Sequence, residues 1–382
     1  MRLFFLIFFM IYGVIHLYAF LKARSALAFG LGTAICVILF MLAMILAPVI
    51  VRYSERFGFE FFARIMAHIG FIWGAVLFLF FSASLVIDLY RLAVYLAGLM
   101  LQRDFSAISL STGYSFFIPL LLSLCISVYG YFEARDVRTE RILIRTPKIP
   151  AETGRMKIVQ ITDVHLGLMV REGRLKLILD KVKAEDPDVL VSTGDLLDGQ
   201  VCKLNGLEDL FKDIRPRYGK FAITGNHEFY AGIENAICFT ENAGFTLLRG
   251  ESVPVAGIIN IAGVDDPAGK TLGLAHDISE KELLSGLPRK KFTLFLKHRP
   301  LVDKTAIGLF DLQLSGHIHK GQIFPFTLVT ALLYPITSGR LDLPDNSVMY
   351  VSRGSGTWGP PIRFLAPPEV TTIELVHADL SE

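Results

Sequence analysis

Four long apolar runs in the first third of the chain most strongly constrain how it can fold. They cover residues 3–21, 26–51, 69–87 and 113–132, and a further apolar stretch extends the third run to residue 101. A helix needs about 20 apolar residues to cross a bilayer, and each run is close to that length. Hydrophobic residues make up 52% of the 382 residues, too many for an ordinary soluble protein of this size. The sequence therefore predicts about four transmembrane helices within residues 1–135.

The basic residues between these runs predict how the chain lies in the membrane. If all four runs span, one side carries only Lys22, Arg24 and Arg103. The other side carries Arg2, Arg52, Arg56, Arg64, Arg135, Arg138, Arg141 and Arg145. Loops rich in Lys and Arg normally stay in the cytoplasm, which predicts a multi-pass protein of the inner (cytoplasmic) membrane with its C-terminal part on the cytoplasmic side. That part moves outside if the third region crosses twice, or if the first run is a cleaved signal peptide.

A charged pair lies in the third apolar region. Asp88 and Arg91 are three residues apart, a helical spacing that brings two side chains together. The pair is either a transport or lipid-headgroup site, since charges inside a membrane are often functional, or a self-neutralising pair near the interface.

After residue 135 the composition changes to that of a water-soluble α/β domain, which we predict over residues 136–382. The stretch "RTERILIRT" alternates like an edge strand. Short apolar runs then recur, each ending in polar residues: "MKIVQITDVH", "PDVLVSTGD", "GKFAITGNHE", "IINIAGVDD", "FTLFLKHRP" and "DLQLSGHIH". Helix-like stretches such as 172–184 and 233–243 separate several of them. Strands alternating with helices favour a layered α/β architecture with ligand sites at the carboxyl ends of the strands.

Side chains that can bind metals gather at these predicted strand ends. The clusters are Asp163 and His165; Asp195 and Asp198; Asn226, His227 and Glu228; His298; and His317 and His319. Residues i and i+2 of an extended segment point to the same face, so His317 and His319 can converge on one object. Carboxylate, imidazole and amide donors without thiolate suit Mn²⁺, Fe, Zn²⁺ or Mg²⁺. The sequence therefore predicts a metal site.

The glycines agree with this interpretation, and the cysteines do not add to it. Gly194, Gly225 and Gly316 each precede a cluster, where a residue without Cβ lets the backbone turn sharply. No C-x-x-C spacing occurs among Cys36, Cys125, Cys202 and Cys238. They predict neither a disulfide framework nor a cysteine zinc site. A net charge of +2 argues against a nucleic-acid partner.

Together these motifs resemble the calcineurin-like metallophosphoesterase family over about residues 156–375. The motifs are D-x-H at Asp163, G-D-x-x-D at Gly194, G-N-H-E at Gly225, the later His298, and G-H-x-H at Gly316. The ending "YVSRGSGTWGPPIRFLAPPEVTTIEL" is similar to a membrane-attached branch of that family. The resemblance implies a four-layer α/β/β/α sandwich, preceded here by the transmembrane bundle.

The resemblance also implies a role for each cluster residue. Two divalent metal ions, most simply Mn²⁺, would share Asp195. Metal one would take Asp163, His165 and His319, and metal two would take Asn226, His298 and His317. His227 would be the proton donor or phosphate contact, while Asp198 and Glu228 either orient ligands or cap loops. Two cations about 3.5–4 Å apart lower the pKa of a bridging water and supply a hydroxide nucleophile.

One residue departs from the branch. Lys320 follows the second histidine of "GHIHKGQ", where glycine is usual. Its ammonium group either reaches a second phosphate of the substrate or belongs to a solvated loop.

Two features favour a lipid-linked substrate. The first is the predicted membrane anchor, with the lipid bilayer as a partner. The second is the apolar segment "IFPFTLVTALLYPI", residues 323–336, which is either a flap at the membrane interface or a piece of the core. Within the resembling branch, one such reaction cleaves the pyrophosphate of UDP-2,3-diacylglucosamine in lipid A biosynthesis.

Other functions remain open from the sequence. One is a general phosphodiesterase acting on glycerophospholipids, cyclic nucleotides or other small substrates. Outside enzymes, the alternatives are a scaffold that has lost catalysis, which missing ligands would reveal, and a membrane sensor or transporter regulated by the metal domain. The sequence does not fix the oligomeric state.

Overall fold

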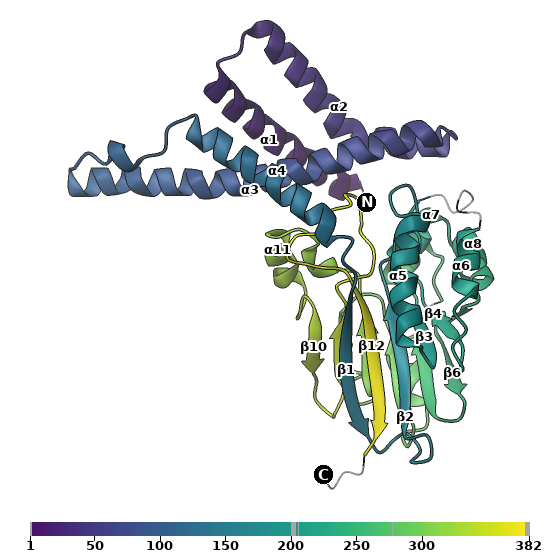
Figure 1. Cartoon of the computed structure of the whole chain (residues 1–382). Helices are drawn as coiled ribbons and strands as arrows, with labels where there is room; N and C mark the ends of the chain where they lie inside the picture. Colours follow the sequence, from purple (N-terminus) through teal and green to yellow (C-terminus); the bar gives the residue numbers. More distant parts are fainter. Residues whose placement is uncertain (1, 200–203, 205, 277, 379–382) are drawn as a thin grey trace. The chain divides into compact units, whose positions relative to one another are not determined.

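The computed structural model describes residues 2–199, 204, 206–276 and 278–378. The chain divides into two compact units, Met1–Phe132 and Glu133–Glu382. We call them the helical unit and the α/β unit, and describe each by itself (Figure 1).

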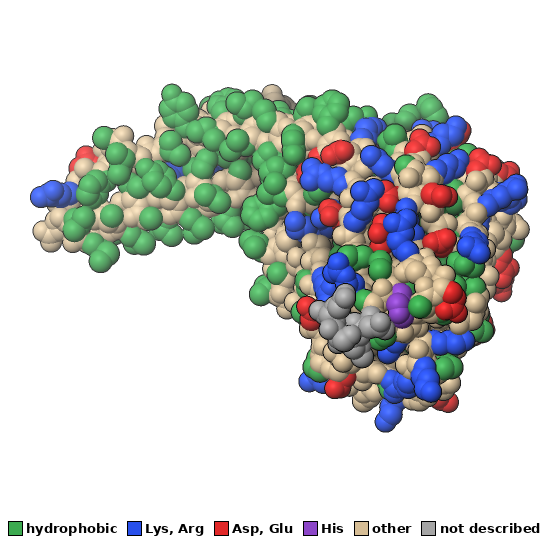
Figure 2. Space-filling view, turned by 60° about the horizontal axis from the view of Figure 1, so that its bottom comes forward, with side chains coloured by type: hydrophobic (Ala, Val, Ile, Leu, Met, Phe, Trp, Pro, Cys, Tyr) green, Lys and Arg blue, Asp and Glu red, His purple; other side chains and the backbone are tan. Residues whose placement is uncertain are grey.

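The helical unit contains the predicted apolar runs as long helices. They are α1 (Arg2–Leu27), α2 (Leu31–Arg56), α3 (Glu60–Leu101) and α4 (Tyr114–Glu133), with a short 3₁₀ turn η1 (Ser106–Ile108) before α4. In the described part of the chain, four helices are long and apolar enough to cross a membrane. The third region does not break in two, because α3 runs without interruption for 42 residues. Figure 2 shows hydrophobic side chains covering most of this unit.

Small residues let α2 and α3 approach each other closely. Ala47 of α2 is 1% exposed, and Ala63 and Ala67 of α3 are fully buried. A Cβ added at Gly70 would come within 2.6 Å of the Ala47 Cβ atom. Close packing of small residues is the usual way in which helices associate within a membrane.

Polar contacts tie α1 to α3. The carboxylate of Asp88 binds Lys22 Nζ at 2.5 Å and the hydroxyl group of Tyr18 at 2.6 Å. Trp73 donates to His16 Nε2 at 2.9 Å. The sequence spacing paired Asp88 with Arg91, but the ion pair of Asp88 that the structure describes is with Lys22 of another helix. Asp88 therefore contributes to helix packing.

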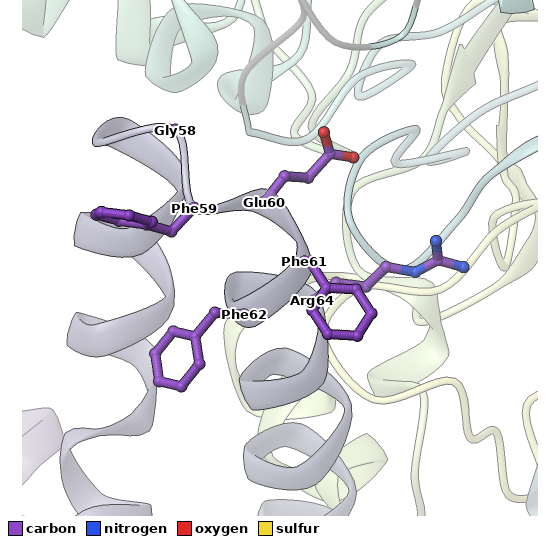
Figure 3. A pocket seen from close by; sticks show the side chains of 6 residues that line it. All are labelled: Gly58, Phe59, Glu60, Phe61, Phe62 and Arg64. Carbon is purple, nitrogen blue, oxygen red and sulfur yellow. The ribbon is translucent and has the colours of Figure 1, made fainter.

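The turn between α2 and α3 forms a cavity of about 550 Å³ (Figure 3). Its lining residues are Gly58, Phe59, Glu60, Phe61, Phe62 and Arg64. Phe59 is 67% exposed and Phe61 is 79% exposed. The residues that line this cavity do not include the predicted metal ligands.

The α/β unit is built on two six-stranded sheets (Figure 1). The first has the order β1-β12-β2-β3-β4-β5 and the second β10-β11-β9-β8-β7-β6. The first sheet comprises β1 (Arg138–Thr146), β12 (Glu369–His377), β2 (Arg155–Ile161), β3 (Val189–Ser192), β4 (Lys220–Ala222) and β5 (Thr246–Leu247). The second comprises β10 (Gly339–Asp342), β11 (Val348–Val351), β9 (Leu312–Ser315), β8 (Phe292–Leu296), β7 (Ile259–Gly263) and β6 (Glu251–Val255). The helices are α5 (Glu172–Glu185), α6 (Leu207–Lys212), α7 (Asn226–Ala231), α8 (Ile233–Asn242), α9 (Pro267–Leu272), α10 (Glu280–Ser285) and α11 (Phe326–Leu333), with a short 3₁₀ turn η3 (His319–Gly321).

Alternating strand residues divide the interior into layers. In β2, Ile158 belongs to the core between the sheets, whereas Val159 belongs to the core that also contains Ile178 of α5. In β8, Leu294 faces the same central core while Phe295 packs with α10 residues. Period-two alternation produces this division because neighbouring side chains of a strand point to opposite faces. The predicted four-layer α/β/β/α sandwich is therefore confirmed, and β1 lies at a sheet edge, as its alternation indicated.

Truncation in the central layer should destabilise the α/β unit. Phe292 begins β8, is 1% exposed, and belongs to the core between the sheets. We expect Phe292→Ala to lower the free energy of unfolding by about 3–5 kcal/mol, because it leaves a large cavity. Thermal unfolding of the detergent-solubilised chain measures the change. Leu272→Ala, at a position that is 39% exposed, is the control, and equal melting temperatures for the two variants would contradict the prediction.

Candidate metal centre

Five strands from the two sheets bring the predicted site residues together. β2, β3 and β4 of the first sheet lead into the Asp163, Asp195 and Asn226 segments. β8 and β9 of the second sheet lead into the His298 and His317 segments. The predicted clusters therefore lie together in the structure, and their ligand atoms form three overlapping groups.

The first group consists of Asp163, His165 and His319, all buried. The Nε2 atoms of His165 and His319 are 3.0 Å apart. His319 Nε2 also lies 3.5 Å from an Asp163 oxygen. These are the three residues that the family resemblance assigns to metal one.

The second group consists of Asp195, His298 and His317. His298 Nε2 lies 3.1 Å from Asp195 Oδ2, and His317 Nδ1 lies 3.2 Å from His298 Nε2. Asn226, the remaining predicted ligand of metal two, is buried at the start of α7.

Asp195 connects the two groups. Its Oδ2 atom is also 3.8 Å from His165 Nε2, and its Oδ1 atom accepts the backbone N–H of His227 at 2.8 Å. A third group of potential ligand atoms joins His165, Asp195 and His227. One carboxylate therefore lies between both sets of histidines, which is the position that a shared ligand requires.

Hydrogen bonds fix the ligand side chains. Thr162 Oγ1 donates to Asp163 at 2.8 Å, and the backbone N–H of His317 donates to the same carboxylate at 2.9 Å. His298 Nδ1 contacts the carbonyl oxygen of Thr193 at 2.8 Å. A histidine held at one nitrogen in this way presents the other nitrogen as a ligand.

Glu228 and Asp198 both form hydrogen bonds to groups of the site. The Glu228 carboxylate accepts backbone N–H groups of Gly225 at 2.6 Å, Asp195 at 3.0 Å and Leu197 at 3.1 Å. It also completes a capping box at the start of α7, so the loop-capping interpretation describes the same contacts. Asp198 Oδ1 lies 2.9 Å from His227 Nδ1.

The backbone is left-handed at five of the predicted ligands. The φ angles are 52° at Asp163, 56° at His165, 51° at Asp195, 75° at His317 and 48° at His319. Such angles are uncommon for residues other than glycine and cost about 1–2 kcal/mol each. The left-handed conformation turns the side chains towards one another. The surrounding hydrogen bonds must offset its cost.

Two glycines leave the room that the carboxylates need. A Cβ added at Gly316 would lie 2.2 Å from an Asp163 oxygen, and one at Gly225 would lie 2.2 Å from an Asp195 oxygen. Any larger residue at these positions would displace a predicted ligand.

Burial and neighbouring charges perturb the site. Burial raises the pKa of Asp163 to about 6 and lowers the pKa of His165 to about 4. Against the opposing effect of burial, His298 and His227 hold the pKa of Asp195 well below its usual range. Likewise, although burial alone would lower it, the carboxylates of Asp195 and Asp198 raise the pKa of His227 to about 9. Perturbations of this kind are typical of functional sites.

The residues present fit divalent cations. Imidazole nitrogens face each other at 3.0 Å and 3.2 Å in the two groups, a repulsive arrangement of lone pairs unless a proton or cation lies between them. Among the described side chains, the buried His165 Nδ1 and Asn226 Oδ1 atoms also have no hydrogen-bond partner. Cys36, Cys125 and Cys238 are exposed and free, and Cys202 lies outside the described residues. The candidate donors are thus carboxylates and imidazoles, and the Asn226 amide oxygen is a further candidate.

Sequence reasoning missed Arg363, the largest fully buried side chain described. Arg363 Nη2 donates to His319 Nδ1 at 3.0 Å, and the guanidinium group also donates to backbone oxygens. These carbonyls belong to Arg353, Gly354, Gly356 and Ala366. One signal was available, an arginine within a Gly- and Pro-rich segment, but nothing in its spacing assigns it to a metal ligand.

Two aromatic rings beside the site were also missed. The ring centroids of Tyr334 and His317 are 5.9 Å apart, and those of Trp358 and His227 are 5.9 Å apart. Neither ring belongs to one of the metal-ligand motifs, so the sequence offered no signal that places them at the site.

Lys320 occupies a backbone conformation that suits glycine. Its φ angle is 52° and its ψ angle is 29°. The glycine usual in the resembling branch is therefore favoured by the local backbone, and the lysine here adds an ammonium group at some cost in strain.

Comparisons with known proteins agree with this geometry. Residues 156–321 match the family model described as calcineurin-like phosphoesterase. An uncharacterized metallophosphoesterase of Aquifex aeolicus is 38% identical over 258 residues, covering 67% of this chain and 98% of the relative. An uncharacterized metallophosphoesterase of Campylobacter jejuni is 32% identical over 306 residues, covering 77% of this chain and 78% of that protein. A zebrafish (Danio rerio) transmembrane protein with metallophosphoesterase domain is 30% identical over 296 residues, covering 74% of this chain and 68% of that protein.

The chain belongs to the calcineurin-like metallophosphoesterase family. It is a metal-dependent phosphoesterase that binds divalent metals. The long apolar helices, together with relatives named as transmembrane proteins, indicate membrane association.

Filling the space beside Asp163 should impair metal binding. We expect Gly316→Ala to reduce the bound metal per chain, because the new methyl group would displace the Asp163 carboxylate. Elemental analysis of the purified protein measures the metal content. Gly286→Ala is the control, since a Cβ there has no neighbour within 4 Å, and full metal content in both variants would refute the assignment.

Proposed function

We propose that this protein hydrolyses a phosphodiester or pyrophosphate bond in a lipid-linked substrate, such as UDP-2,3-diacylglucosamine of lipid A biosynthesis. The observation that carries the reaction is the pair of ligand groups joined by Asp195, with His227 beside them. Metal one takes Asp163, His165, Asp195 and His319, and metal two takes Asp195, Asn226, His298 and His317. Mn²⁺ is the first metal to test, and Fe, Zn²⁺ and Mg²⁺ suit the same donors.

Two bound cations would neutralise the phosphoryl oxygens and lower the pKa of an attacking water. The side chains of the protein supply positioning and a proton. Asp198 forms a hydrogen bond with Nδ1 of His227, so the Nε2 atom is available to contact a substrate oxygen. Because the surrounding carboxylates favour its imidazolium form, His227 can donate a proton to the leaving oxygen.

The surroundings of the site support a substrate with one polar and one apolar end. A cavity of about 160 Å³ adjoins His298 and is lined by Lys270, Lys297 and Arg299 together with acidic residues. Arg299 is held by Asp266 at 2.7 Å. Tyr334, whose ring contacts that of His317, follows directly after the apolar helix α11. Cleavage between a polar headgroup and an acyl-bearing part suits this arrangement.

Membrane attachment supports the same choice of substrate. The long apolar helices would anchor the enzyme in the inner membrane. The excess of basic residues on one side of the predicted spans supports a cytoplasmic position for the α/β unit. A transporter is less well supported, because Lys22 and Tyr18 already satisfy Asp88. The alternative within the enzyme class is a general phosphodiesterase.

The substrate proposal is tested by comparing two compounds. With Mn²⁺ present, the detergent-purified protein should hydrolyse UDP-2,3-diacylglucosamine with a much higher kcat/KM than bis-p-nitrophenyl phosphate. Asp195→Ala, which removes the shared ligand, should be inactive on both and low in metal. Turnover of the small diester alone would leave a general phosphodiesterase, and a fully active Asp195→Ala protein would refute the two-metal site.

The role of His227 is tested separately from metal binding. We expect His227→Asn to lower kcat by about 10²–10⁴-fold, the usual contribution of a general acid. Metal content should stay at the wild-type level, because His227 is not assigned as a ligand. Loss of metal together with activity would instead make His227 a ligand.

Lys320 is proposed to contact the second phosphate of a diphosphate substrate. Glycine suits the left-handed backbone at this position, so Lys320→Gly removes the ammonium group without added strain. We expect KM for the diphosphate substrate to rise several-fold and KM for bis-p-nitrophenyl phosphate to stay constant. An unchanged KM for the diphosphate would leave Lys320 as a solvated loop residue.

A further inference from the structure

Helix α11 exposes almost all of its apolar side chains. It consists of the residues "FTLVTALL", and Thr330 is its only buried member. Phe326 is 46% exposed, Leu328 60%, Leu332 87% and Leu333 67%. In an ordinary soluble domain, a surface helix turns such residues towards the core.

Two exposed residues from the C-terminal segment lie beside the start of this helix. Trp358 is 56% exposed and Leu365 is 52% exposed. Gln322 donates to the Trp358 carbonyl oxygen and accepts the Trp358 N–H, both at 2.9 Å. Ile323 forms a β-bridge with Phe364, the neighbour of Leu365. We call the surface formed by Phe326, Leu328, Leu332, Leu333, Trp358 and Leu365 the α11 apolar face.

The α11 apolar face is held firmly in place. Thr327 Oγ1 donates to the Lys320 carbonyl oxygen at 2.7 Å, which fixes the first turn of α11 to the metal-ligand loop. Beneath the helix, Ile336 and Tyr334 pack against a core of Ile318, Met349 and Val351. The helix that carries the exposed side chains is therefore attached to the domain by specific contacts, and these side chains form a defined part of its surface.

This face also adjoins the metal centre. Trp358 contacts the ring of His227, and Tyr334, one residue after α11, contacts the ring of His317. Elsewhere, the visible surface of the α/β unit carries closely mixed basic and acidic side chains (Figure 2). An apolar patch at the edge of an active site usually marks a binding surface.

We propose that the α11 apolar face inserts into the acyl layer of the bilayer that holds the helical unit. A bilayer is the partner that the rest of the chain favours, because the long apolar helices already associate the protein with a membrane. Leucine, phenylalanine and tryptophan are the side chains that enter the interfacial region of a bilayer most readily. Insertion would hold the metal centre at the lipid surface, so a lipid headgroup could reach it without leaving the bilayer. This last link rests on the proposed function, whereas the insertion itself does not.

Insertion can be measured without any assay of catalysis. The chain has two tryptophans, so Trp73→Phe leaves Trp358 as the only one. In phosphatidylcholine nanodiscs, bromine atoms on the acyl chains should quench Trp358 fluorescence relative to unbrominated discs. Its emission should also lie at shorter wavelength than in detergent-free denaturant. Equal fluorescence in brominated and unbrominated discs would overturn the proposal.

The consequence for the reaction is tested with exposed leucines. Leu332→Ser/Leu333→Ser should lower kcat/KM for UDP-2,3-diacylglucosamine in nanodiscs by about tenfold or more, because two apolar anchors are lost. Hydrolysis of bis-p-nitrophenyl phosphate should not change. Leu143→Ser/Leu177→Ser is the matched control, at positions that are 46% and 41% exposed on other elements.

The outcomes separate the two proposals. Quenching of Trp358 without turnover of the lipid by the wild-type protein would support insertion and refute the proposed substrate. Turnover of the lipid without quenching of Trp358 would refute insertion and support the proposed substrate. An equal loss on both substrates in the Leu332→Ser/Leu333→Ser variant would mean that the helix supports the fold, and would refute its role in reaching lipid.

Discussion

The carboxylate of Asp195 is the constraint on which the rest of the site depends. It lies between His165, which follows a strand of the first sheet, and His298, which follows a strand of the second, so the two sheets must be packed together before the site exists. Burying this charge without partners would cost several kcal/mol. The backbone N–H of His227 and the nearby imidazoles offset that cost, and bound cations would offset more of it. Glu228 in turn holds the backbone that carries Asp195. The sandwich thus serves to hold one anion where two cations can reach it.

The sequence predicted the strands and the residues that gather at their ends, because both follow from local patterns. Strand periodicity placed Asp163, Asp195 and His298 at carboxyl ends, and the order of strands in the sheets then brought them together. Arg363 could not be found in this way, since its contact with His319 joins segments that no periodicity relates. The left-handed backbone of the ligands was equally hidden, because it results from tertiary hydrogen bonds rather than from residue type.

In the helical unit, too, local patterns were predictable from the sequence and tertiary contacts were not. Run length and composition predicted the long apolar helices, which depend only on local hydrophobicity. The partner of Asp88 depends on helix packing, and the spacing rule selected Arg91 where the structure has Lys22. For residues 323–336, sequence hydrophobicity could not distinguish a flap from a piece of core. The structure shows that Leu332 and Leu333 are exposed, so these two residues are not part of the core.

The position of β12 has a consequence for how the protein is made. This strand lies between β1 and β2, pairing in parallel with the first and antiparallel to the second. β1 follows the apolar helices closely, yet it cannot join its sheet until β12 has been synthesised. Contacts that span most of a domain form late, because a long loop must close first. The apolar helices are therefore complete before the catalytic sheet is, and the sheet that carries Asp163 and Asp195 is finished only after β12 has been synthesised.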